Sequence, residues 1–327
     1  MPVTRALGAR DLPPAFAPLL APLRDEARLI AERALANLAA LREVGDRLDA
    51  ARVPWMLWKG PALAMQVWGD ATRRDSRDLD LVVPPEAWDA ARAALADGGW
   101  QVPGGLGPRG ERAIHGWTRA VPLRREGRPL VELHWAFAGA NYPRVADVRS
   151  VLARAETFTV GGRAVRTPAG ADALLLLALH ATKHGWSQAE EVLSFARLAS
   201  RSPEALGEAV AMADAAGVPR VLALALALRE ALLGTPAPAT RHDGRLLAMR
   251  DACLARMEAG NGAWRTTRAW TLSWIDRPRD RWRHRAGALW RPTPQEAQWL
   301  RLPEALAWAY PAVRLLRLAV RPLGLAR

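Results

Sequence analysis

A short apolar segment that begins with two carboxylates constrains this chain more than any other feature. Residues 78 to 83 read Asp-Leu-Asp-Leu-Val-Val, which is typical of a buried β-strand. Side chains two positions apart on a strand leave the same face, so Asp78 and Asp80 project together while the leucines pack on the other side. Two carboxylates this close repel each other unless a cation lies between them, and Mg²⁺ is commonly held by carboxylates together with substrate phosphates. The segment therefore predicts half of a metal site.

A third carboxylate follows on a second predicted strand. Residues 130 to 135 alternate between apolar and polar side chains, so Glu132 and His134 share one face. We expect this strand to pair with residues 115 to 123 across a turn at residues 124 to 129. Glu132 thereby becomes a third acidic group near the Asp pair, whereas His134 beside it has no assigned role.

A glycine turn precedes the Asp strand and has the features of a phosphate-binding loop. Residues 55 to 58 read as a short buried strand, and a helix is predicted from residue 61 to 68 with Pro61 at its first position. Gly60 allows the backbone to approach a phosphate at the helix N-terminus, where free N–H groups favour anions. Pro61 removes one of those donors, so the neighbouring Lys59 is expected to supply positive charge to the phosphates.

Helical periodicity dominates the rest of the chain. The predicted helices are residues 17–50, 86–96, 145–156, 169–184, 186–200, 203–216 and 219–233, with further helices after residue 245. A small hairpin is predicted at residues 157–167, turning at Gly161 and Gly162. The chain thus combines a few strands with many helices.

These motifs together resemble the nucleotidyltransferase superfamily, which has the DNA polymerase β-like fold, and within it a bacterial family of uncharacterised nucleotidyltransferases. The resemblance is strong over residues 53–135 and partial to about residue 200. It implies an α+β fold, in which a mixed β-sheet of the nucleotidyltransferase type has flanking helices and is followed by a mainly helical C-terminal region. The motifs that carry it are Leu57-Trp58-Lys59-Gly60, Arg74 four residues before Asp78, the strand at residues 78–83, Val131-Glu132-Leu133-His134 and, more faintly, residues 177–184.

The resemblance also implies a role for each motif residue. Asp78 and Asp80 hold the metal ions of a nucleoside triphosphate, with Mg²⁺ expected and Mn²⁺ as the alternative. Glu132 fills the third acidic position, either as a metal ligand or as the base for the acceptor hydroxyl. The expected nucleotide-binding residues are Lys59, Gly60, Arg74, His180 and Lys183, of which the last two are as well explained by a plain cluster at a helix end.

Four parts are expected along the chain. They are an N-terminal helical lead (residues 1–50), a nucleotidyltransferase core (51–166), a helical domain (167–235) and a helical tail rich in arginine and tryptophan (236–327). The tail favours contact with an anionic surface, although tryptophans in a helical core explain it equally well. A single cysteine, Cys253, and the lack of a long apolar run indicate a cytoplasmic protein with no transmembrane segment.

The expected function is transfer of a nucleoside monophosphate from a nucleoside triphosphate to an unidentified acceptor. The net charge of +13 disfavours a polycationic acceptor such as an aminoglycoside, although arginine-rich composition weakens that inference. An anionic or neutral acceptor fits better, such as a peptide, a natural-product intermediate or an RNA end. The alternative is a non-catalytic, antitoxin-like module with the same fold that acts on nucleic acid or a protein partner, which Pro61 and the unusual tail favour.

Overall fold

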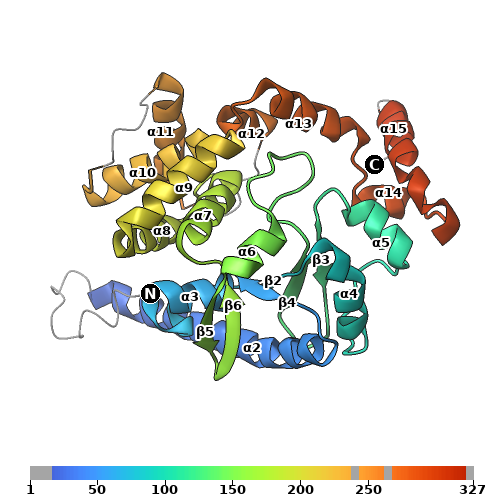
Figure 1. The fold of residues 1–327 in the computed structure, drawn as a ribbon, viewed down its shortest axis with the longest axis horizontal. Helices are drawn as coiled ribbons and strands as arrows, with labels where there is room; N and C mark the ends of the chain where they lie inside the picture. Colours follow the sequence, from blue (N-terminus) through green and yellow to red (C-terminus); the bar gives the residue numbers. More distant parts are fainter. Residues whose placement is uncertain (1–16, 237–242, 261–266, 322–327) are drawn as a thin grey trace. The chain divides into compact units, whose positions relative to one another are not determined.

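The structure, a computed structural model, describes residues 17–236, 243–260 and 267–321 (Figure 1). The chain divides into two compact units. The first unit comprises Met1–Gln101, Pro122–His134 and Leu152–Pro168, and the second comprises Val102–Val121, Trp135–Val151 and Ala169–Arg327. The four-part division expected from the sequence stays a prediction.

A mixed four-stranded sheet with the strand order β1-β2-β4-β3 organises the first unit. Strand β1 runs antiparallel to β2, and β2 runs parallel to β4. The mixed sheet with flanking helices and a helical C-terminal region confirms the expected α+β fold. The elements around the sheet are α2 (Ala17–Ala50), β1 (Met56–Trp58), α3 (Gly60–Trp68), η2 (Ala71–Arg73), β2 (Asp78–Val82), η3 (Pro85–Ala87), α4 (Trp88–Ala96), β3 (Ala120–Leu123), β4 (Leu130–His134), β5 (Glu156–Val160) and β6 (Arg163–Thr167).

One face of this sheet forms the core of the first unit. Leu79 and Leu81 of β2 and Val131 and Leu133 of β4 are all fully buried. Because strand side chains alternate between faces, this burial leaves Asp78, Asp80, Glu132 and His134 together on the opposite face. Helices α2 and α3 both pack against β2. The packing therefore fixes the direction in which the carboxylates point.

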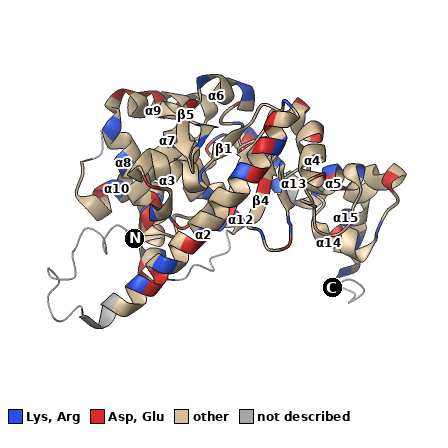
Figure 2. Ribbon diagram, turned by 90° about the horizontal axis from the view of Figure 1, so that it is seen from below, with Lys and Arg blue, Asp and Glu red and all other residues tan. Residues whose placement is uncertain are grey.

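Helix α2 spans Ala17–Ala50, as predicted for residues 17–50, and packs against β2. Its buried side presents Ile30, Ala34, Leu41, Val44 and Leu48, at helical spacing. Its outer side carries charges of both signs (Figure 2). The excess positive charge of the chain is thus not concentrated on this helix.

The second unit is helical. Its elements are α5 (Pro108–His115), α6 (Val148–Arg154), α7 (Gly170–His184), α8 (Ala189–Arg201), α9 (Pro203–Ala216), α10 (Pro219–Leu233), α11 (Gly244–Glu258), α12 (Arg268–Trp274), α13 (Pro278–Trp290), α14 (Pro294–Trp299), η4 (Glu304–Ala309) and α15 (Tyr310–Val320). Helices α7 to α10 pack against one another around buried leucines (Figure 1). Among the described residues, none of the helices combines the length and the apolar character that crossing a bilayer requires.

The strand predicted at residues 115–123 is wrong in its first half. Residues Pro108–His115 form helix α5, and strand β3 begins only at Ala120. Pro108 starts the helix, and α5 packs against η4, which lies almost two hundred residues further along the chain. A distant tertiary contact therefore decides a local conformation that the strand-like pattern around it obscures.

Candidate active site

The register of three strands brings the predicted acidic residues together. Asp80 lies opposite Trp58 of β1 on one side and opposite Glu132 of β4 on the other. Residues paired across neighbouring strands share a face, so these three side chains form a row on one face of the sheet. As expected, Glu132 lies on a strand that neighbours the Asp strand.

Two cationic groups converge on Asp80. The Lys59 Nζ lies 3.0 Å from Asp80 Oδ1, and the His134 Nε2 lies 2.9 Å from the same oxygen. His134 Nε2 also lies 3.3 Å from Glu132 Oε2, so the imidazole links two carboxylates. The side chain of Asp80 is only 2% exposed, whereas that of Glu132 is 34% exposed. The buried carboxylate is therefore compensated by its neighbours, and the more open one faces solvent.

These contacts set the ionisation of the cluster. Burial alone would raise the pKa of Asp80, but Lys59 and His134 outweigh it and hold the pKa at about 2. Burial likewise disfavours the charged form of His134, yet hydrogen bonds to Asp80 and Glu132 raise its pKa. The hydrogen bond from His134 lowers the pKa of Glu132. These contacts thus favour the anionic forms of Asp80 and Glu132 and the protonated form of His134.

Asp78 behaves differently from the other two carboxylates. Burial, and then repulsion from Asp80, raise its pKa from 3.8 to about 6. Burial is the larger cause and repulsion adds to it, so Asp78 is protonated more readily than an ordinary carboxyl group. An added cation would relieve that repulsion, which is the property expected of a metal site.

The glycine turn before α3 is strained at the residue that reaches Asp80. Lys59 has φ 65° and ψ −149°, a conformation that side chains other than glycine rarely adopt. Gly60 follows with φ 48°, and a Cβ there would lie 2.9 Å from Ser76 Oγ. Pro61 occupies the first turn of α3, so the missing N–H donor predicted from the sequence is a feature of the folded turn.

The residues that could hold a metal ion form a compact group. Asp80, Glu132 and His134 each offer a ligand atom, and these atoms all lie within 4.8 Å of one another. Mg²⁺ prefers oxygen ligands, so the nitrogen ligand in this group fits Mn²⁺ better than Mg²⁺. Asp78 is not one of the three members of the group. His134 is the member that the sequence left unassigned, although the alternation Val131-Glu132-Leu133-His134 already placed it on the face of Glu132.

The remaining predicted nucleotide-binding residues lie elsewhere in the chain. Arg74 follows η2 in an extended conformation and is partly exposed. His180 and Lys183 belong to α7 in the second unit, where the His180 and His184 rings lie 4.5 Å apart between centroids. Lys183 Nζ lies 5.4 Å from the centre of the Tyr142 ring. The roles of Arg74, His180 and Lys183 toward a nucleotide stay predictions.

A basic pocket of about 560 Å³ also lies in the first unit. Its arginines already have acidic neighbours, because Arg33 and Arg77 contact Asp75 while Arg128 contacts Glu43. This pairing accounts for the positive charge without a ligand. The pocket is lined by Arg33, Ala36, Asn37, Ser76, Arg77, Gly127, Arg128 and Pro129.

Comparison with known proteins identifies the family of this chain. The family model for uncharacterised nucleotidyltransferases matches residues 3–234, so the chain belongs to that family. Its general reaction is therefore nucleotidyl transfer, and the match ends before the helices that follow α10. No curated protein matches the chain. The chain is also similar to a solved structure, the solution structure of the antibiotic-resistance factor ANT(2'')-Ia. The two share 16% sequence identity with a TM-score of 0.39, and the match covers 54% of this chain and 91% of that chain.

Proposed function

We propose that the protein transfers a nucleoside monophosphate from a nucleoside triphosphate to an acceptor hydroxyl and releases pyrophosphate. The observation that carries the proposal is the pairing of Asp80 with Glu132 on adjacent parallel strands, with Lys59 and His134 in contact with Asp80. In this reaction the acceptor oxygen bonds to the α-phosphorus, and the bond from that phosphorus to the bridging oxygen breaks. Pyrophosphate leaves with the electron pair of the broken bond.

A divalent cation fits the charges of this site. Asp78, Asp80 and Glu132 bring three carboxylates, and Lys59 and His134 are the basic groups beside them. After burial, repulsion from Asp80 contributes to the raised pKa of Asp78. These carboxylates would hold Mg²⁺, or Mn²⁺ with His134 as a further ligand once its ring nitrogen has given up its proton. A bound cation of this kind supplies compensation of phosphate charge and alignment of an in-line displacement.

The side chains of the protein are proposed to contact the phosphates and to remove the proton of the acceptor. Lys59 is placed to meet the triphosphate as well as Asp80, and the Gly60 turn allows close approach of the backbone to phosphate. Arg74 is assigned to the leaving pyrophosphate, and His180 and Lys183 are assigned to the nucleotide or the acceptor. Glu132, as the more exposed carboxylate, is the candidate base that takes the proton of the acceptor hydroxyl.

The acceptor is proposed to be anionic or neutral, because the net charge of +13 disfavours a polycation. A peptide, a natural-product intermediate and an RNA end all satisfy this condition. Incubating the protein with each labelled nucleoside triphosphate, a divalent cation and a cell extract should transfer label to one product, which mass spectrometry would identify. Wild-type protein that labels nothing under any of these conditions would contradict the proposal.

The alternative of a non-catalytic binding module rests on Pro61, which removes a donor from the phosphate-binding turn. The Lys59 contact favours the enzyme over this alternative, because an ammonium group beside Asp80 supplies positive charge where the turn lost a donor. Pyrophosphate release separates the two, since a module without catalysis would bind a partner and release none.

A further inference from the structure

The helix α15 near the C-terminus presents leucines to solvent and buries an arginine. Arg317 is 5% exposed, whereas Leu315 and Leu316 are 39% and 52% exposed. An ordinary surface helix would turn its leucines inward and its arginines outward. Two questions follow: what holds Arg317 on the inner side of the helix, and what the exposed leucines contact on its outer side.

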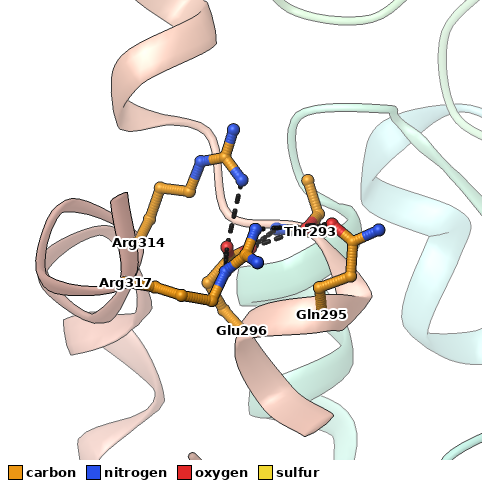
Figure 3. A network of polar contacts seen from close by, with 5 residues as sticks. All are labelled: Thr293, Gln295, Glu296, Arg314 and Arg317. Carbon is orange, nitrogen blue, oxygen red and sulfur yellow. Dashed lines mark hydrogen bonds and ion pairs between the residues drawn. The ribbon is translucent and has the colours of Figure 1, made fainter. Parts of the chain in front are cut away.

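The cause is a buried carboxylate on the neighbouring helix α14. Glu296 is fully buried, and its Oε1 accepts hydrogen bonds from Arg317 Nε at 2.6 Å and from Arg314 Nη1 at 3.0 Å (Figure 3). Its other oxygen, Oε2, accepts from the Thr293 backbone N–H at 2.5 Å and from the Thr293 hydroxyl at 2.6 Å. The two bonds from Thr293 hold Glu296 at the start of α14, and the two charge-assisted bonds from Arg314 and Arg317 turn this side of α15 inward.

The outward stripe of α15 is apolar and continuous. Trp308 precedes the helix and is 76% exposed, and Ala312, Leu315, Leu316 and Ala319 follow it at helical spacing as exposed residues. We call these five residues the apolar face of α15. The inward stripe, by contrast, packs Tyr310 and Val313 with Ala307 and with Ile114 of α5.

The segment that carries this apolar face is rich in positive charge. The segment from Arg268 to Arg321 holds eleven arginines against four acidic residues, so it supplies +7 of the chain's net +13. Helix α13, which packs against α15, exposes Arg279, Trp282 and Arg283 on one face. Exposed tryptophan and leucine among arginines are the composition of a surface that lies in the interface of a bilayer with anionic headgroups.

We propose that the apolar face of α15 docks on the surface of a bilayer that contains anionic lipids. A second copy of the chain is a poorer occupant, because two such positively charged segments would repel each other. A stable protein interface also needs roughly 20 to 30 residues a side, far more than this face provides. A bilayer requires only shallow insertion of a few apolar side chains together with attraction of the arginines to lipid phosphates.

Vesicle sedimentation of the full chain tests this proposal. We expect the protein to sediment with vesicles of phosphatidylcholine mixed with phosphatidylglycerol, and far less with phosphatidylcholine alone. The double variant Leu315→Gln and Leu316→Gln should weaken binding at least about tenfold, because it removes apolar area that the bilayer would bury. Both side chains are exposed, so the fold should persist.

A matched control lies in the same unit. Leu232 and Leu233 are adjacent leucines of α10 with exposures of 43% and 42%, and the variant Leu232→Gln with Leu233→Gln should bind vesicles as the wild type does. Trp308→Ala gives a second variant expected to weaken binding. Equal loss in the control pair, undiminished binding by the α15 variants, or equal binding to neutral vesicles would each overturn the proposal. Light scattering that shows a dimer which dissociates only in the Leu315 and Leu316 variant would overturn it in favour of self-association.

Discussion

Asp80 and Glu296 are two buried carboxylates with the same pKa and opposite surroundings. Each has a pKa of about 2, because cationic partners outweigh the cost of burial. Glu296 meets only donors among its contacts, since Arg314, Arg317 and Thr293 satisfy both of its oxygens. Asp80 shares Lys59 and His134 with two further carboxylates.

The difference bears on the proposal that the cluster on β2 and β4 binds a cation and the Glu296 network does not. The Glu296 network has two arginines for one carboxylate and needs nothing more. In the cluster on β2 and β4, burial and then repulsion from Asp80 raise the pKa of Asp78. A buried carboxylate with a low pKa is thus no sign of function by itself, whereas several carboxylates on one face, one of them with a raised pKa, mark a candidate functional site.

The largest expected effect of a substitution is on catalysis. Asp80→Asn should reduce pyrophosphate release by about 10³-fold, the loss typical when a preorganised electrostatic contact is removed. The amide is isosteric with the carboxylate, so circular dichroism should show an intact fold. The matched change Glu296→Gln should leave the rate per folded molecule unchanged. A rate close to wild type in Asp80→Asn would remove Asp80 from the reaction.

The next effect is on stability. Glu296→Ala should lower the free energy of unfolding by about 3–5 kcal/mol, because it leaves the buried Arg317 without its carboxylate. Urea unfolding measures this, and Glu258→Ala on the exposed end of α11 is the control, with an expected change near zero. A loss below about 1 kcal/mol would mean that the network does not hold α15 in place.

The third effect depends on pH and concerns Asp78. Its folded pKa of about 6 lies above its ordinary value of 3.8, so the folded state binds this proton more tightly. The stability gained from that proton is fully present below pH 3.8 and is lost as pH rises through about 6. In the presence of a chelator, Asp78→Asn should therefore become more stable than the wild type above this range, by on the order of 3 kcal/mol. Parallel stability curves for the two proteins would show that Asp78 is not under electrostatic stress.

The smallest expected effect distinguishes the two possible ligand sets. His134→Gln keeps a donor beside Asp80 but removes the nitrogen ligand, so affinity for Mn²⁺ should fall about tenfold and that for Mg²⁺ should fall less. Asp78→Asn should show the reverse order, because it removes an oxygen ligand. Titrations of both variants with both metals measure this. Equal losses for the two metals would mean that His134 lies outside the ligand set.

The sequence could predict the row of carboxylates because strand alternation is a local property. The pattern at residues 78–83 and at residues 130–135 placed Asp80 and Glu132 on one face, and the parallel pairing of β2 with β4 made them neighbours. The contacts of Lys59 and His134 with Asp80 could not be predicted, because they depend on side-chain conformation and burial. The positive φ of Lys59 has no signal in the sequence either.

In the C-terminal tail, the sequence pattern could not predict which side chains are buried. Its tryptophans divide between core and surface, since Trp274 is buried while Trp282 and Trp308 are exposed. The spacing of residues in α15 cannot reveal that Arg317 faces inward, because that depends on Glu296 about twenty residues earlier in the chain. Ion pairs between separate helices help to decide which face of a helix is buried, and they cannot be predicted from composition alone.

Calorimetric titration of Mg²⁺ and each nucleoside triphosphate into the wild type and into Asp80→Asn tests most directly whether the cluster on β2 and β4 is a metal and nucleotide site. We predict that the wild type binds at least one nucleoside triphosphate only when the metal is present, and that Asp80→Asn loses this metal-dependent binding. Nucleotide binding of equal strength with and without metal, or no binding by the wild type at all, would contradict that assignment.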